Sequence, residues 1–164
     1  MEIHTTRFGN IDIDETKIIE MRGAIIGFEH LRKYILLHTK DEKSPYSWFQ
    51  SLEDGAIAFV VINPYVVKSD YRPVIADNDA VILEIENAED VVLLAIATIR
   101  QAPFSVSVNL KAPLVINSKR KIGKQVVLED CVYPIQYFLT SDSGNEISAR
   151  RDSANSHDSG EVSP

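Results

Sequence analysis

A chain of 164 residues, 45% of them hydrophobic, can bury one sizeable core but hardly two, and its net charge of -7 is by itself a weak clue to function. The longest apolar run, residues 91–99, is far shorter than the roughly 20 residues that span a bilayer, and residues 1–7 lack the apolar region of a signal peptide. Cys131 is the only cysteine, which excludes an intrachain disulfide and a CxxC metal or redox motif. We therefore expect a soluble, cytoplasmic, single-domain protein.

The first half of the chain predicts short strands and little helix. The stretch "RFGNIDI" places a turn at Gly9 and Asn10 between two short strands, whereas "GFEHLRKY" from Gly27 allows one or two helical turns. Apolar runs at residues 33–39 and 57–65 are typical of strands.

The secondary structure of residues 77–86 is ambiguous, whereas that of residues 91–99 is clear. Residues 77–86, "DNDAVILEIE", fit a short helix capped by Asp77 or Asp79, but their alternating apolar residues also fit a strand. The apolar run at residues 91–99 predicts a central strand.

Residues 105–112 alternate in polarity and predict a half-buried strand. One side would carry Val106, Val108, Leu110 and Ala112, and the polar side would carry Ser105, Ser107, Asn109 and Lys111. Pro113 lacks an amide hydrogen and is expected at a sheet edge or bulge. After it, "SKRKIGK" should form a hairpin loop between a strand at "LVIN" and a strand at "QVVLED". Gly123 would supply the positive φ that such a turn needs.

These short strands and turns predict a mostly β fold, a compact antiparallel β-barrel-like or sandwich single domain with one or two short helices. We assign this domain to residues 1–140. Residues 141–164 hold seven serines, almost no large apolar residue, and five acids against two arginines. They are expected to form a disordered, acidic, serine-rich tail.

Charge is segregated along the body of the chain. Between Arg72 and Arg100 there is no base, and the acids are Asp77, Asp79, Glu84, Glu86, Glu89 and Asp90. Residues 91–128 contain no acid, and their bases are Arg100, Lys111, Lys119, Arg120, Lys121 and Lys124. These runs are either ordinary solvated faces and loops or two docking surfaces of opposite sign.

Catalytic and metal-binding motifs are not evident. The four histidines show no HxxxH spacing, and neither GxSxG nor GxxxxGK[ST] occurs. A lone cysteine such as Cys131 is usually a small buried hydrophobe, and Glu84 with Glu86 suits a solvated face better than an acid–base pair. We expect no metal, no cofactor and no enzymatic activity.

Six segments resemble the flagellar assembly factor FliW family: "GFEHL" at Gly27, "SWFQSLED" at Ser47, "AFVVINPY" at Ala58, "VNLKAPLVIN" at Val108, "GKQVVLED" at Gly123 and "YPI" at Tyr133. The resemblance extends from about Ile3 to Leu139. The family's usual "GIPGFE" is "AIIGFE" here, so Ala24 and Ile26 replace a glycine and a proline, and Gly55 stands where a proline is common.

The resemblance implies a binding protein. Members of this family bind the C-terminal region of flagellin. They also bind CsrA, a small RNA-binding translational repressor, and antagonise it without occupying its RNA-binding site. Accumulating flagellin would capture the protein, and the freed CsrA would repress flagellin translation. Such a partner switch follows from mass action between mutually exclusive complexes. Direct contact with nucleic acid or membrane is not expected.

The candidate partner-binding residues are Lys111, Asn117, Asn63, Gln50, Glu84, Glu86 and Tyr133. Lys111 is the strongest, because alternation puts it beside Asn109 on the polar face. Phe28 and Trp48 also lie in matched segments but suit a core equally well, and Asn63, Pro64 and Asn117 suit turns. The acidic stretch, including Glu84 and Glu86, is hypothesised to face CsrA.

The alternative is a small nucleic-acid-binding barrel whose basic hairpin loop, residues 119–124, follows phosphates. Its weakness is that residues 106–128 contain no Phe, Tyr or Trp to stack on bases. A small enzyme that uses Cys131 is a third possibility, but the sequence identifies no catalytic partner for it.

Overall fold

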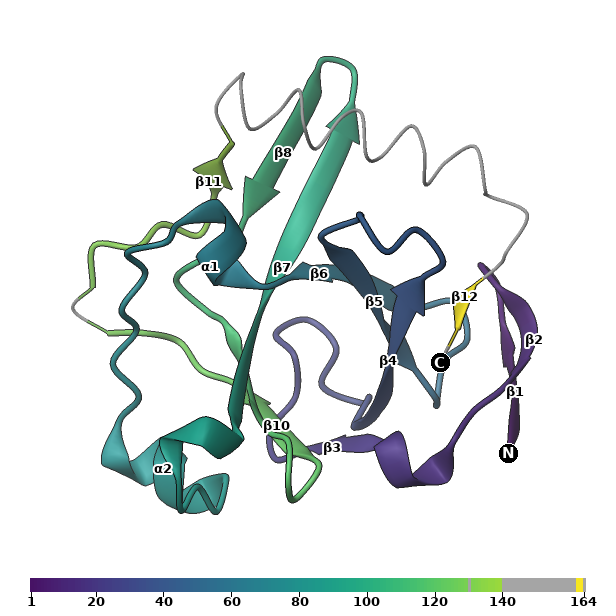
Figure 1. The fold of residues 1–164 in the computed structure, drawn as a ribbon, viewed down its shortest axis with the longest axis horizontal. Coiled ribbons are helices and arrows are strands. Elements are labelled where there is room, and N and C mark those ends of the chain that lie inside the picture. Colours follow the sequence, from purple (N-terminus) through teal and green to yellow (C-terminus); the bar gives the residue numbers. More distant parts are fainter. Residues whose placement is uncertain (130, 140–161, 164) are drawn as a thin grey trace.

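A computed structural model describes residues 1–129, 131–139 and 162–163 (Figure 1). The strands are β1 (Glu2–Thr5), β2 (Gly9–Asp12), β3 (Ile19–Met21), β4 (Lys33–Thr39), β5 (Tyr46–Ser51), β6 (Ala58–Ile62), β7 (Val91–Gln101), β8 (Phe104–Val108), β9 (Leu114–Asn117), β10 (Ile122–Gln125), β11 (Tyr137–Phe138) and β12 (Val162–Ser163). The helices are α1 (Pro64–Val67) and α2 (Asp77–Ile82), with 3-10 turns at Glu15–Lys17 and Ala88–Asp90. The predicted mostly β fold with short helices is confirmed.

Seven strands close into a barrel in the order β7, β6, β5, β4, β3, β10, β9, with β9 pairing back onto β7. All neighbours are antiparallel except β10 and β3, which run parallel. β1 and β2 form a separate antiparallel hairpin. Closure removes the exposed edges that an open sheet of these strands would present.

The barrel interior is filled by apolar residues from the central strands. Tyr34 of β4 stacks on Phe49 of β5, with ring centroids 4.6 Å apart and planes 5° apart, and both side chains are fully buried. A second buried cluster lies between β7, β8 and the segments that follow α1 and α2, and it includes Tyr71, Leu83 and Leu110. One chain of this length thus builds adjoining clusters in a single domain.

β7 is the predicted central strand, and it belongs to two parts of the fold. Its first residues pair with β9 in the barrel, whereas Ala97–Gln101 pair with β8 in an arm that projects from the barrel (Figure 1). β11 lies on the outer edge of β8. Between β8 and β9 the chain leaves the sheet at residues 109–113. The strand predicted over residues 105–112 therefore ends at Val108, and Pro113 lies in this connection, directly before β9.

Four local predictions were wrong, each for a physical reason. Residues 27–34 form no helix, because Gly27 has φ +92° and Ile25 bridges to Phe28 in a tight turn that leads into β4. Residues 77–82 are helical, but the cap is Ala76, without a side-chain hydrogen bond. The first hairpin turns at residues 6–8, and Gly9, with φ +68°, already starts β2.

The basic hairpin supplies the fourth correction. Lys121, not Gly123, takes the positive φ, at +57°. Gly123 lies inside β10, where an added Cβ would come within 3.1 Å of Met21 Sδ and 3.3 Å of Ile116 Cγ1. The glycine therefore allows close packing between strands. β10 also ends at Gln125, so most of the expected "QVVLED" strand is irregular.

The predicted tail, residues 141–164, lies outside the described residues except for β12. Val162 and Ser163 pair with Thr39 and His38 of β4. The division between a domain at 1–140 and a disordered tail stays a prediction.

Two buried tyrosines give the fold a predictable sensitivity to alkali. Burial raises the pKa of Tyr34 from 10 to about 12, and burial also raises the pKa of Tyr71. The unfolded chain releases these protons near pH 10, so the contribution of the two tyrosines to the free energy of unfolding should be constant below that pH and fall as pH rises from 10 to about 12. Urea unfolding across this range, with ultraviolet titration of phenolate, measures the effect.

Tyr34→Phe is the control, because the Tyr34 hydroxyl has no hydrogen-bond partner among the described residues and its removal keeps the ring stack. The variant should fold and lose part of the alkaline decline. If all six tyrosines of the folded protein ionise near pH 10, the assignment is wrong.

Candidate functional site

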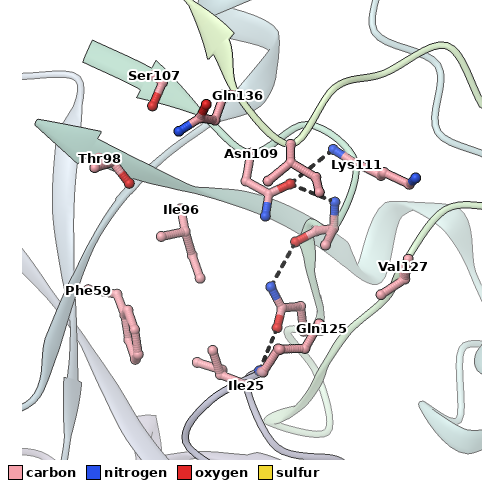
Figure 2. A pocket seen from close by; sticks show the side chains of 13 residues that line it. Ile25, Phe59, Ile96, Thr98, Ser107, Asn109, Lys111, Gln125, Val127 and Gln136 are labelled. Carbon is pink, nitrogen blue, oxygen red and sulfur yellow. Dashed lines mark hydrogen bonds between the residues drawn. The ribbon is translucent and has the colours of Figure 1, made fainter. Parts of the chain in front are cut away.

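A groove of about 510 Å³ lies where the arm leaves the barrel (Figure 2). β6 and β7 pair only at Val61–Ile96 and Ile62–Ala95, and the groove lies beyond that pairing, beside Phe59 and Thr98. Its remaining wall comes from loops. The lining residues are Ile25, Ile26, Phe59, Ile96, Thr98, Ser107, Asn109, Lys111, Ala112, Gln125, Val127, Ile135 and Gln136.

The floor and the rim of the groove are apolar. Ile25, Phe59 and Ile96 pack onto the barrel core and form the floor. The rim exposes large apolar side chains, with Ile26 64% and Ile135 62% exposed. Val127 is 48% exposed on the same rim. Apolar residues gathered around a hollow are typical of a surface that binds another molecule.

A line of hydrogen bonds holds one wall in place (Figure 2). Asn109 Oδ1 accepts from the backbone N–H groups of Lys111 at 3.2 Å and Ala112 at 3.0 Å. Gln125 Nε2 donates to Ala112 O at 3.2 Å, and Gln125 Oε1 accepts from Ile26 N at 2.9 Å. Three loops far apart in sequence are thereby joined, which fixes the groove before any partner arrives.

Lys111, the strongest sequence candidate, is the one ionisable residue among the described residues that line the groove. Strand alternation does not place it there, since β8 ends at Val108. The Asn109 side chain instead closes a turn around it, and Lys111 N also donates to Pro134 O at 3.2 Å. No ion pair to Lys111 occurs within residues 1–129 and 131–139.

Two other candidates are buried and serve the fold. Gln50 is 0% exposed, and its Nε2 donates to the carbonyls of Ser51, Gly55 and Ile57. Asn117 is 2% exposed. Its Nδ2 donates to Leu83 O and Glu84 O, and its Oδ1 accepts from the N–H groups of Lys119 and Arg120.

Asn63 and Tyr133 organise the segments around α1. Asn63 is exposed and caps α1, accepting from Tyr65 N at 3.0 Å, with Pro64 in the first turn. Tyr133 is half-buried, packs edge-on against Tyr71 and accepts from Arg72 N at 2.7 Å. The interpretation of Asn63 and Asn117 as turn-shaping residues is confirmed.

Phe28 and Trp48, which the sequence left between core and surface, are both half-buried. Phe28 packs edge-on against Phe59 beneath the groove, with ring centroids 4.9 Å apart. Trp48 contacts Phe8, and Arg7 lies 4.2 Å from its ring.

The acidic stretch and the basic hairpin face each other. Lys124 pairs with Asp79, Arg120 with Glu86 at 3.6 Å, and Arg22 with Glu84 at 3.6 Å. Asn117 ties the same two segments together through Leu83 and Glu84. Much of the charge segregation in the sequence is therefore complementary within the molecule. Glu84 and Glu86 keep 49% and 64% of their side-chain surface exposed.

The same contacts weaken the alternative of a nucleic-acid-binding hairpin. Arg120 and Lys124 are in ion pairs, and Lys121 Nζ donates to Ser118 O. Side-chain cations that already pair with a carboxylate or a carbonyl contribute less binding free energy to a contact with phosphate.

The described residues contain no cluster of three His, Cys, Asp or Glu side chains that could hold a metal ion. Cys131 is half-buried, and its Sγ lies 3.5 Å from Leu128 O and 3.8 Å from Tyr133 O. Within the same part of the chain, no helix is long and apolar enough to span a membrane.

Sequence reasoning missed most of the groove. Ile26, Val127 and Ile135 lie in irregular segments, where no periodicity distinguishes a groove residue from a core residue. One signal was present, because Ile26 is one of the departures from the "GIPGFE" pattern.

Comparisons with known proteins agree on one family. The family model "FliW protein" matches residues 2–139. "Flagellar assembly factor FliW" from Syntrophus aciditrophicus (strain SB) is 49% identical over 156 residues, which cover 91% of this chain and 98% of that protein. The protein of the same name from Caldicellulosiruptor saccharolyticus is 39% identical over 140 residues, covering 85% and 91%. A solved structure, "Crystal structure of the flagellar assembly factor FliW", has TM-score 0.77 and 31% identity, covering 84% of this chain and 96% of that chain.

Proposed function

This chain belongs to the FliW family of flagellar assembly factors, and from that membership we propose that it binds the C-terminal region of flagellin and antagonises a CsrA-type translational regulator. The two complexes exclude each other, so the level of free flagellin decides how much regulator is released. The protein works by binding, without catalysis and without touching nucleic acid. It acts in the cytoplasm, where flagellin is made.

The observation that carries the proposal is that the family match extends over the whole barrel and arm, residues 2–139. The groove with its exposed apolar rim supports a binding role, because a rigid, partly apolar hollow suits a peptide segment. The α2 segment, which is residues 77–86 and so includes α2 and the four residues after it, supplies a second surface of different character. It has exposed carboxylates at Glu84 and Glu86 and an exposed Val81. Two unlike surfaces suit two unlike partners.

A release experiment tests the partner switch. The purified chain is first bound to CsrA from the same organism, and the C-terminal region of that organism's flagellin is then added. Size-exclusion chromatography should show CsrA leaving the complex in proportion to added flagellin. A stable ternary complex, or no binding of either partner, would refute the proposal.

Charge reversal at Glu84 and Glu86 tests the hypothesis that this face meets CsrA. Glu84→Lys with Glu86→Lys should lower the CsrA association rate and its salt dependence more than it raises the dissociation rate. The reason is that long-range attraction speeds the diffusional encounter of the two proteins. Flagellin affinity should change less. Immobilised-partner kinetics at two salt concentrations measure both.

The matched control is a double reversal at Glu2 and Glu42, which are exposed acids outside the α2 segment. It changes net charge equally and should leave association nearly unchanged. Equal slowing by both double variants would mean that net charge, and not this face, steers CsrA.

A further inference from the structure

The groove has a polar side that complements a carboxylate. Lys111 brings the only charge among the described residues that line the groove, and none of those residues is acidic. The side-chain oxygen of Asn109 is held by two backbone N–H groups, so its Nδ2 donor faces away from them, toward the groove (Figure 2). A cation beside an amide donor favours a negatively charged oxygen.

The apolar side of the groove complements the apolar face of an amphipathic segment. Ile26, Val127 and Ile135 stand on the rim above a floor of Phe59 and Ile96. Burying large apolar side chains of a partner between floor and rim would remove the exposed rim from water. The occupant therefore needs apolar residues along one face and an acid close to them.

Between the two proposed partners, charge favours flagellin for this groove. An RNA-binding regulator needs positive surface charge to attract phosphate, and at long range that charge is attracted less to the side of this molecule that carries Lys111. The exposed carboxylates of Glu84 and Glu86 suit that regulator better.

We propose that this groove is the docking site for an amphipathic segment in the C-terminal region of flagellin, which packs apolar side chains against Phe59, Ile96 and Ile135 and places a carboxylate beside Lys111. The inference rests on the proposed function, since it assigns one of its two partners to one surface. The flagellin site and the α2 segment are then separate surfaces, so the mutual exclusion proposed above has to arise from overlap of the bound partners or from coupling between the two surfaces, and not from one shared surface.

The test uses the full chain and a fluorescently labelled peptide from the C-terminal region of the same organism's flagellin. Ile135→Asp, Ile26→Asp and Lys111→Glu should each raise the peptide Kd at least about tenfold, which corresponds to ~1.4 kcal/mol. Lys111→Glu should also remove most of the salt dependence of binding. CsrA affinity, measured in the same preparations, should stay within about twofold of the parent value.

Matched controls are Val74→Asp, an apolar residue 84% exposed outside the groove, and Lys119→Glu, an exposed base on the hairpin. Both should leave the peptide Kd within about twofold. Thermal unfolding by circular dichroism verifies folding of each variant. Should an aspartate variant fail to fold, Lys111→Glu still decides the outcome through its Kd and salt dependence.

Three results would overturn the inference. If the parent protein binds the peptide and the groove variants bind it equally well, the groove is not the flagellin site, although the proposed function stands. If the groove variants lose CsrA instead, or change the oligomeric state of the free protein, the occupant is the regulator or a second copy of the chain. If the parent protein binds neither partner, the proposed function fails together with the inference.

Discussion

Asn117→Ala is expected to lower the free energy of unfolding by about 3 kcal/mol, because it removes four hydrogen bonds and leaves buried carbonyls without donors. Leu83 and Glu84 directly follow α2. Glu84 has a positive φ of 52°, and the hydrogen bonds from Asn117 help to hold this conformation. Losing them should also loosen the contact between the acidic segment and the basic hairpin. Urea unfolding followed by Trp48 fluorescence measures the change.

The control for Asn117 is Asn87→Ala, which removes an exposed asparagine with a single 3.4 Å contact to Asp90. It should cost less than about 0.5 kcal/mol. A partner-binding role for Asn117 makes a different prediction, namely that Asn117→Ala keeps its stability and loses affinity. Unchanged urea midpoint and slope with weakened partner binding would contradict the structural role.

Gln50→Leu is expected to destabilise the fold by about 1 to 2 kcal/mol although leucine is nearly isosteric and apolar. Gln50 Nε2 donates to three backbone carbonyls around the turn between β5 and β6, at 3.0 Å to Ser51, 3.3 Å to Gly55 and 3.1 Å to Ile57. Without that amide, Ser51 O loses this donor, whereas Gly55 O and Ile57 O keep their backbone donors, Thr6 N at 3.0 Å and Ser51 N at 2.9 Å. Unfolding in urea, at constant protein concentration, gives the difference.

Gln101→Leu provides the comparison, because Gln101 is exposed at the end of β7. It should change the free energy of unfolding by less than about 0.5 kcal/mol. If Gln50→Leu is equally mild, solvent or a shifted backbone must satisfy Ser51 O, and the amide is not what shapes this turn.

The effects of these substitutions could not be read from the sequence, since an asparagine before a turn and a glutamine in a strand look like surface residues. Partner contact was an open possibility for both. Gln50 and Asn117 are at least 98% buried, and their side-chain amides donate to backbone carbonyls. Both features arise only when β5 packs beside β6 and β9 packs beside the end of α2. Sequence patterns report local polarity, whereas the bonds from Asn117 to Leu83 O and Glu84 O join residues 34 and 33 positions apart.

The sequence by itself determined the fold class, the central strand β7 and the family. Those features depend on alternating or continuous apolar runs and on motifs in order, which are local or linear properties. Whether the acidic and basic runs face solvent or each other was left open, because charge along a chain does not tell which segments meet.

Tertiary structure decided the ion pairs of Asp79, Glu84 and Glu86 and the position of the groove. It also decided that Lys121 is the hairpin residue with a positive φ. β6 and β7 separate after two paired residues, and only then do Ile26, Asn109 and Ile135 come together around Lys111. The physical reason is that barrel closure fixes which loops meet, and closure is a property of the whole set of strand pairings rather than of any segment.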